Sequence, residues 1–264
     1  MRRRRTRTSL RRLLLLLRTV PLQARLTLGA LALLGLAFAV NWTYHVVRKP
    51  AELFFPLSGV LSKTPAETWR QYEPIFREHA TQTITPEFLA ALAQVEGAGN
   101  PVAKTYWRWR LTSDPLDIYR PASSAVGMYQ ITDGTFNEAK RYCIHDHAVA
   151  RDGPWNDPSS CWFNTLYMRV VPSHAVEMTS AFLDRRATET LQQHGLAATP
   201  QQKQDLAAVI HLCGATAGVA YAKRKFRVSP GQRCGDHDIR RYLEHLNAIK
   251  RLFARMASGA TAPR

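Results

Sequence analysis

The chain has 264 residues, which is enough for one substantial domain and an additional segment. Hydrophobic residues make up 45% of it and charged residues 21%, so the composition excludes a disordered chain and predicts a globular core. The net charge of +16 would suggest nucleic-acid binding if it were evenly spread. However, residues 1–50 hold eleven bases and no acid, and the rest of the chain carries 25 bases against 20 acids. The excess charge therefore belongs to an N-terminal arm.

An uncharged apolar segment follows this arm, from Leu26 to Val47. A helix of 22 residues is ~33 Å long, enough to cross the hydrocarbon core of a bilayer. Trp42 and Tyr44 lie near one end, where aromatic side chains favour the membrane interface. We predict a basic cytoplasmic arm over residues 1–25, which would contact anionic lipid headgroups rather than nucleic acid, and a transmembrane anchor over 26–47. The alternative is a cleaved signal peptide, with Ala37-Phe38-Ala39 as the small-residue site.

The rest of the chain reads as mainly α. Residues 48–84 are expected to form a linker and a lead-in helix, because the Thr64-Pro65 pair and Glu67 are typical of a capped helix start. A second Thr-Pro pair predicts a helix from Pro86 to about Glu96, which the following glycines end. Further helices are expected over residues 135–141, 173–193, 201–212 and 238–256, and residues 257–264 are expected to form a flexible tail.

Four cysteines suit a domain exported to an oxidising compartment. An even number predicts two disulfides, for which three pairings are possible, and proximity in the sequence favours Cys143 with Cys161 and Cys213 with Cys234. The alternative is a metal site, because residues 143–147 read CIHDH. The spacings typical of structural zinc and of zinc hydrolases are both missing from the sequence, so we expect no metal and no other cofactor.

Glu96 is a candidate catalytic acid. It lies where the negative end of a helix dipole disfavours a carboxylate, beside Val95 and Leu92, which predict partial burial. Both effects favour the protonated carboxyl, the form that a general acid needs. The alternative is a glutamate that ends the helix and points into water.

A candidate sugar-binding segment follows, in which residues 123–131 read SSAVGMYQI. Small residues let the backbone approach a ligand, an amide offers a donor and an acceptor, and apolar side chains offer contact with a sugar face. The candidate binding residues are Ser123, Ser124, Gly127, Met128, Tyr129 and Gln130. The alternative is a turn that enters the next helix. Aromatic residues just upstream are expected either to stack on sugar rings or to cover the core, namely Tyr106, Trp107, Trp109 and Tyr119.

These segments resemble the soluble lytic transglycosylases. Residues 95–101, VEGAGNP, are similar to the Glu-Ser-x-Phe-Asn-Pro segment in which that family's glutamate is catalytic. Residues 123–131 are similar to its Ser-x-Gly-Ala-x-Gly-Leu-Met-Gln-Ile segment, and residues 208–219 resemble its Ala-x-Ala-Tyr-Asn-Ala-Gly segment more weakly. The resemblance covers roughly residues 85–225, and Tyr242 is a candidate for a late family tyrosine. It implies a lysozyme-like helical domain over residues 85–256 in the periplasm, held by a single-pass anchor in a bacterial inner membrane.

The resemblance implies a single-carboxylate mechanism. Glu96 would cleave the bond between N-acetylmuramic acid and N-acetylglucosamine in peptidoglycan, leaving a 1,6-anhydro end. The sequence departs from the family at Gly97, where a serine is usual, at Ser124 and Met128-Tyr129, and at His211, where a tyrosine is usual. His211 is a candidate replacement for that tyrosine, or else a core residue. Two alternatives stay open: a muramidase that uses water, and an inactive glycan-binding or scaffolding module of an envelope-spanning machine. No protein partner is indicated.

Overall fold

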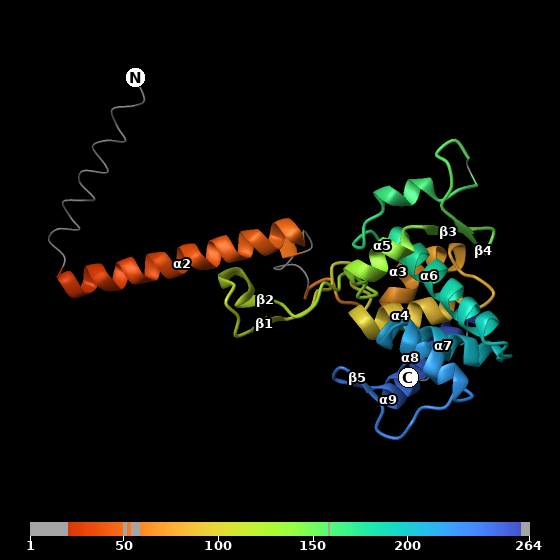
Figure 1. Ribbon diagram of the computed structural model, residues 1–264. Helices are drawn as coiled ribbons and strands as arrows, with labels where there is room; N and C mark the ends of the chain where they lie inside the picture. Colours follow the sequence, from red (N-terminus) through yellow and green to blue (C-terminus); the bar gives the residue numbers. More distant parts are fainter. Residues whose placement is uncertain (1–20, 50–51, 54–58, 158, 260–264) are drawn as a thin grey trace. The chain divides into compact units, whose positions relative to one another are not determined.

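A computed structural model describes residues 21–49, 52–53, 59–157 and 159–259, and its chain divides into two compact units (Figure 1). One unit contains the chain up to residue 50 together with residues 107–120, and the other contains residues 51–106 and 121–264. Most of the predicted cytoplasmic arm and the end of the predicted tail lie outside the described residues. The predicted domain of residues 85–256 is therefore interrupted, because residues 107–120 belong to the N-terminal unit.

The N-terminal unit consists of a long helix and a small hairpin. Helix α2 (Leu22–Arg48) is, among the described residues, the one helix long and apolar enough to cross a membrane, and its side chains are mostly exposed. The predicted anchor of residues 26–47 lies within it. Strands β1 (Trp107–Trp109) and β2 (Tyr119–Pro121) form a two-stranded sheet, and the short 3-10 helix η2 (Pro115–Asp117) lies in the connection between them.

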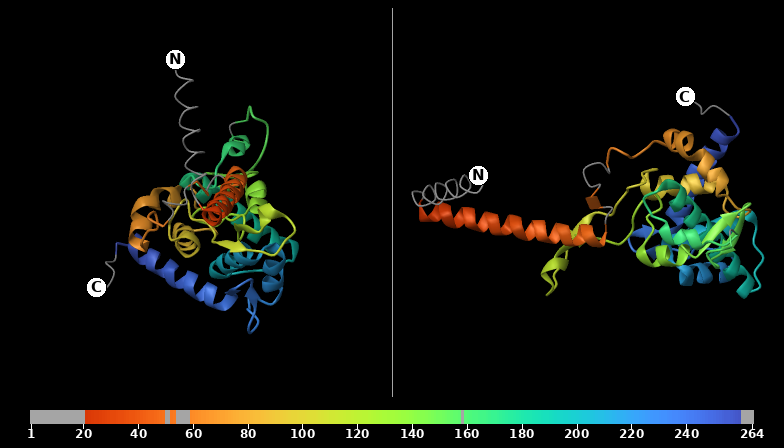
Figure 2. Two further views of the ribbon diagram at one scale, coloured as in Figure 1. Left: turned by 90° about the vertical axis from the view of Figure 1, so that its left-hand side faces the viewer. Right: turned by 90° about the horizontal axis from the view of Figure 1, so that it is seen from above.

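The second unit is built around a buried helix, α4 (Pro86–Gly97), in which residues 88–93 are all buried. Ala90, Ala91 and Ala93 are among these buried residues, and their small side chains let other helices pack closely against α4 from several sides. It contacts α3 (Pro65–Glu78) and α9 (Ile239–Ala257), while α6 (Pro172–Gln193) contacts α7 (Pro200–Cys213), as Figures 1 and 2 show. The lead-in helix α3 buries Trp69, Tyr72 and Phe76 in the same core.

The predicted helices are confirmed with small changes at their ends. Helix α3 begins with the expected capping box of Thr64 and Glu67, and α7 begins with an equivalent box. Helix α5 (Asp133–Ala139) begins two residues earlier than expected, because Thr132 caps it. Helix α8 (Ala215–Lys223) was not predicted. Gly214 separates it from α7, and Gly218 lets it pack closely against Ile210, where a Cβ atom would lie 2.4 Å from the Ile210 Cγ1 atom.

Three two-stranded antiparallel hairpins complete the described chain, so the mainly α class is confirmed. Strands β3 (Tyr142–His145) and β4 (Ala148–Arg151) form the second hairpin, and β5 (Arg233–Cys234) and β6 (His237–Asp238) form the third. The expected disulfides are both present, Cys143–Cys161 and Cys213–Cys234. The second joins the end of α7 to β5 and thereby holds the third hairpin. The first uses both sulfurs that the metal interpretation needed beside His145, so neither is a thiolate ligand in this form.

Candidate active site

Glu96 lies in the last turn of α4 and its side chain is only 16% exposed. Helix α4 ends at Ala98, whose backbone is left-handed with a φ of 48°, and no basic residue lies in its last turn. Glu96 opens into a cavity of about 360 Å³ formed with the third hairpin and α9. The other lining residues are Val95, Arg233, Asp236, His237, Asp238, Arg241, Tyr242 and His245. The glutamate therefore does not simply end a helix and point into water.

Tyr242 holds the carboxyl of Glu96. Its hydroxyl donates a hydrogen bond to Glu96 Oε1 at an O···O distance of 2.5 Å. The two residues are far apart in sequence, and they meet because α9 packs along α4. Burial raises the pKa of Tyr242 well above its usual value, and the nearby Glu96 carboxylate raises it further. Tyr242 therefore keeps its proton and remains a donor throughout the neutral and mildly alkaline range.

His211 also approaches this carboxyl. Its Nε2 atom lies 3.8 Å from Glu96 Oε1, and its side chain is 9% exposed in the last turn of α7. This distance is too long for a hydrogen bond, so Tyr242 is the direct partner of Glu96 Oε1 and His211 is a neighbour. The structure thus brings His211 to the acid, as the resemblance implied, although the tyrosine that contacts the acid comes from α9.

The binding segment of residues 123–131 meets Glu96 through its backbone. A Cβ atom added at Gly97 would lie 2.8 Å from Met128 Cα and 2.9 Å from Met128 O. A serine at Gly97 would therefore collide with this backbone, which explains the departure from the family pattern. Met128 and Tyr129 have 0% exposure, and the Tyr129 hydroxyl donates to the Leu89 carbonyl. The expectation that these two side chains contact a sugar was wrong, because both face the core.

The polar residues of the same segment bind protein backbone. The Gln130 amide donates to the carbonyls of Ala103 and Gly127, and Ser124 Oγ accepts from the Asp133 amide. Ser123 Oγ accepts a hydrogen bond from a backbone amide two residues further along. Among the described residues, none of the candidates between residues 123 and 130 lines the cavity of Glu96. Ser123, Ser124, Gly127 and Gln130 remain candidates for substrate contact only through surfaces outside this cavity.

Gly127 has a specific packing role. Its φ of +81° is unfavourable for other residues, and a Cβ atom there would lie 2.4 Å from the Arg169 carbonyl oxygen. Arg169 also donates to the carbonyls of Ser124 and Ile131 and pairs with Asp133. The segment is therefore a closely packed turn whose backbone lies against the end of α4 and leads into α5.

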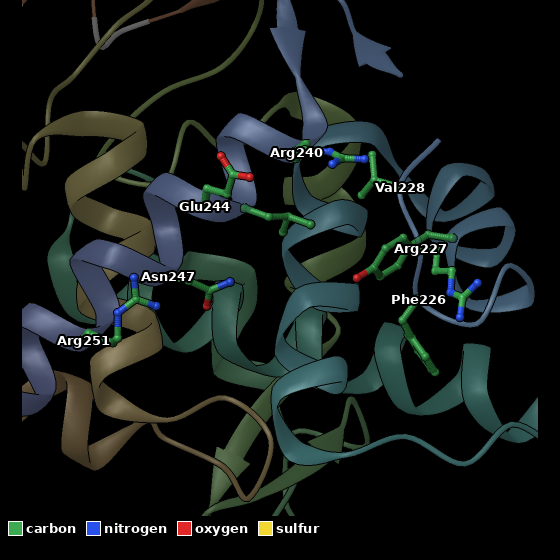
Figure 3. A pocket seen from close by; sticks show the side chains of 9 residues that line it. Phe226, Arg227, Val228, Arg240, Glu244, Asn247 and Arg251 are labelled. Atoms are coloured by element: carbon green, nitrogen blue, oxygen red, sulfur yellow. The ribbon is translucent and has the colours of Figure 1, made fainter. Parts of the chain in front are cut away.

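A second cavity, of about 610 Å³, lies elsewhere along α9 (Figure 3). Tyr221 and Phe226 form part of its wall, and its charged lining is mainly basic, with Arg227, Arg240, Arg251 and one acid, Glu244. Glu244 is exposed to solvent, whereas Glu96 is largely buried and hydrogen-bonded. The larger cavity therefore offers positive charge for binding an acidic ligand. The smaller cavity contains Glu96, which is the better placed of the two glutamates to act as a catalytic acid.

The sequence did not predict the residues of the third hairpin and α9 that surround Glu96. Arg233, Asp236 and Arg241 belong to no motif, and Tyr242 was noted only as a possible match to a late tyrosine. The usable signal was Cys234, whose disulfide places the hairpin at the end of α7 next to His211.

Comparisons with known proteins agree with this geometry. A family model described as the transglycosylase SLT domain matches residues 73–199, a range that includes Glu96 and the segment of residues 123–131. No curated protein shows significant similarity to the chain. His211 and Tyr242 lie beyond the matched range, so their proximity to Glu96 is a finding of the structure. The chain therefore contains a transglycosylase SLT domain, which belongs to the lysozyme-like superfamily.

Proposed function

We propose that this protein is a membrane-anchored lytic transglycosylase that cleaves the MurNAc–GlcNAc bond of peptidoglycan and leaves a 1,6-anhydroMurNAc end. The SLT domain suggests lytic transglycosylase activity on peptidoglycan. The observation that carries the finer proposal is the hydrogen bond from Tyr242 to Glu96 Oε1 inside the smaller cavity. It supports an acid that is held in one orientation with its second oxygen available to a substrate.

In the proposed reaction Glu96 acts first as an acid and then as a base. With Oε1 accepting from Tyr242, the carboxyl proton resides on Oε2 and passes to the glycosidic oxygen as the bond from that oxygen to C1 breaks. The acetamido group of the substrate assists the departure. The Glu96 carboxylate then takes the proton of the 6-hydroxyl, whose oxygen bonds to C1. No water is consumed, and Glu96 ends protonated again, with the proton of the 6-hydroxyl in place of the one that left on the glycosidic oxygen.

The anchor part of the proposal is supported by α2. Its length and apolar composition suit a membrane span, and the arginines that precede it favour a cytoplasmic N-terminus. This orientation supports a periplasmic SLT domain whose anchor lies in the inner membrane. Contacts of the hairpin of residues 107–120 with Phe38, Asn41 and His45 favour a retained helix, because cleavage after Ala39 would divide this contact set.

The decisive variant is Glu96→Gln. It keeps the size of the side chain and an oxygen that accepts from Tyr242, but it has no proton to give, so we expect a folded protein that releases no glycan fragments. The assay is fragment release from purified peptidoglycan, with the thermal midpoint as the folding control. Wild-type cleavage by Glu96→Gln would remove Glu96 as the acid. An inactive wild-type protein that still binds glycan would instead support the scaffolding alternative.

A hydrolase is the second candidate, and one observation favours it. Asp236 lines the cavity of Glu96 and would be a second carboxylate that could activate water. Asp238 lines the same cavity, but its carboxylate accepts from the Arg241 amide at the start of α9. If the reaction is hydrolysis, Asp236→Asn should abolish cleavage and the wild-type product should carry a reducing end. If it is transglycosylation, Asp236→Asn should cleave, and mass spectrometry should find products one water lighter.

A further inference from the structure

The hairpin of residues 107–120 is docked on α2 by polar and aromatic contacts. Asn41 Nδ2 donates to the Tyr119 carbonyl at 2.7 Å, and His45 Nε2 lies 2.8 Å from the Leu116 carbonyl oxygen. Phe38 lies edge-on to Trp109 and Tyr119, with ring centroids 6.3 and 6.2 Å apart. Asn41 and His45 are buried, although they belong to an otherwise exposed apolar helix. Asn41 and His45 are therefore covered by the hairpin.

This hairpin has large apolar and aromatic side chains that are exposed to solvent. Leu111 is 104% exposed and Trp109 is 66% exposed, and Ile118 is exposed as well. Trp109 and Ile118, together with Leu34 of α2, line an apolar cavity of about 220 Å³ between the helix and the hairpin. Such a surface is unfavourable in water, and the adjoining surface of α2 is apolar in the same way.

Charged groups accompany these apolar residues. Arg108 and Arg110 alternate with Trp107 and Trp109 along the hairpin and are exposed, whereas Arg120 is neutralised by an ion pair with Asp117. Arg48, at the end of α2, lies over the Tyr44 ring. Tryptophan and tyrosine beside arginine are the side chains that favour the level of lipid headgroups, where the rings meet the acyl chains and guanidinium groups meet phosphate.

We propose that residues 107–120 form a second membrane-binding element, which inserts into the lipid interface beside α2. This inference rests on the proposed membrane anchoring of α2. It also moves the membrane boundary, because a hairpin with open strand edges and charged residues does not lie in hydrocarbon. The last turns of α2, which Asn41 and His45 fix to the hairpin, lie at headgroup level. The hydrocarbon span is then Leu22 to about Phe38, where Trp109 and Ile118 of the hairpin reach the boundary of the acyl chains. At 1.5 Å per residue this span is ~26 Å, which is near the lower limit for a transmembrane helix.

The test uses the full chain in vesicles of phosphatidylethanolamine and phosphatidylglycerol. All four native cysteines are in disulfides, so a single introduced cysteine can carry a fluorescent label. The label is placed at Leu111→Cys in the hairpin, at Leu33→Cys in α2, and at Gln193→Cys on the exposed end of α6 as a water control. Lipids carrying a nitroxide near the headgroup or near the end of the acyl chain quench labels at the corresponding depth.

We expect the Leu111 label to lose fluorescence with the headgroup-proximal nitroxide, the Leu33 label with the deep nitroxide, and the Gln193 label with neither. If the Leu111 label behaves like the Gln193 label while the Leu33 label is quenched, the hairpin proposal is overturned and the anchor stands. An unquenched Leu33 label would instead overturn the anchor itself. Shielding of the Leu111 label in native membranes but not in pure lipid would assign the surface to a protein partner and also overturn the proposal.

A second measurement tests the docking contacts. The paired substitutions Asn41→Ala and His45→Ala remove both side-chain bonds to the hairpin carbonyls while leaving the apolar part of α2 intact. We expect the Leu111 label to lose its headgroup quenching in this background and the Leu33 label to keep its deep quenching. Unchanged quenching of the Leu111 label would show that the hairpin reaches the membrane without these two bonds to α2. That result would contradict the proposal that Asn41 and His45 hold the hairpin at headgroup level.

Discussion

Replacing Tyr242 by phenylalanine tests whether the hydroxyl acts through Glu96. The substitution keeps the ring in the core and removes only the donor to Glu96 Oε1. In the proposed reaction the carboxyl becomes a carboxylate as the glycosidic bond breaks, so this hydrogen bond strengthens toward the transition state. A group that stabilises the transition state more than the bound substrate acts on kcat rather than on KM.

The size of the effect follows from the type of hydrogen bond. A bond to a charged acceptor contributes about 1.5–3 kcal/mol, and each 1.36 kcal/mol changes a rate about tenfold. Only the difference between the two states acts on kcat, and a bond to the neutral carboxyl of the ground state contributes about 0.5–1.5 kcal/mol. The difference of about 1–1.5 kcal/mol means that Tyr242→Phe should lower kcat about 5- to 13-fold. The expected residual activity distinguishes this positioning residue from Glu96, whose replacement by glutamine should remove cleavage altogether.

The assay is the rate of fragment release from peptidoglycan at several substrate concentrations, with the thermal midpoint measured in parallel. Tyr221→Phe is the matched control, because Tyr221 is another buried tyrosine whose pKa is raised to about 12 by burial and which lies in the larger cavity away from Glu96. An equal loss of kcat in both variants, or a loss that follows the thermal midpoint, would refute the reasoning. So would a rise in KM with kcat unchanged.

Three further outcomes are expected. Gly97→Ser should lower the free energy of unfolding by about 1–3 kcal/mol in denaturant unfolding, because its side chain would collide with the Met128 backbone. Gly134→Ser is the control, because a side chain there has open space around it, and equal effects of the two variants would contradict the close approach. Reduction of the two disulfides should destabilise the domain by roughly 3 kcal/mol for each, and an unchanged unfolding midpoint once four thiols titrate would argue against this. The stability that Tyr129 and Tyr242 contribute should be fully present below about pH 10 and be lost above it, because burial raises the pKa of both and the folded chain keeps protons that the unfolded chain loses. A Tyr129→Phe variant with the same pH dependence would count against this cause.

Local signals made the helices and the disulfides predictable. The capping boxes at Thr64 and Thr199 depend on residues three positions apart, so the sequence contains all the atoms that decide them. The disulfides join cysteines 18 and 21 residues apart, which made the nearer pairing a sound choice. Helix α8 escaped prediction because its position depends on Gly218 meeting Ile210, which is a packing contact and leaves no periodic pattern.

The aromatic segment upstream of residue 120 shows a different limit. Trp107, Trp109 and Tyr119 were assigned either to sugar binding or to the core, and the structure places them on α2, about seventy residues earlier in the chain. Residues 107–120 belong to the unit of the N-terminal helix although the residues on both sides of them belong to the other unit. The amino-acid composition of the segment does not indicate this. Met128 and Tyr129 show the same limit, because an apolar side chain next to a binding motif suits a ligand and a core equally well.

The apolar N-terminal helix, the helical class, the favoured cysteine pairs and the acid at the end of a helix were predictable from the sequence, because each depends on residues close together in the chain. The surroundings of that acid depend instead on contacts between helices that are distant in the sequence. Tyr242 reaches Glu96 across 146 residues because α9 packs on α4, and Gly97 is required by the backbone of Met128. These contacts are set by the packing of whole helices, and no local pattern encodes which side chains that packing brings together.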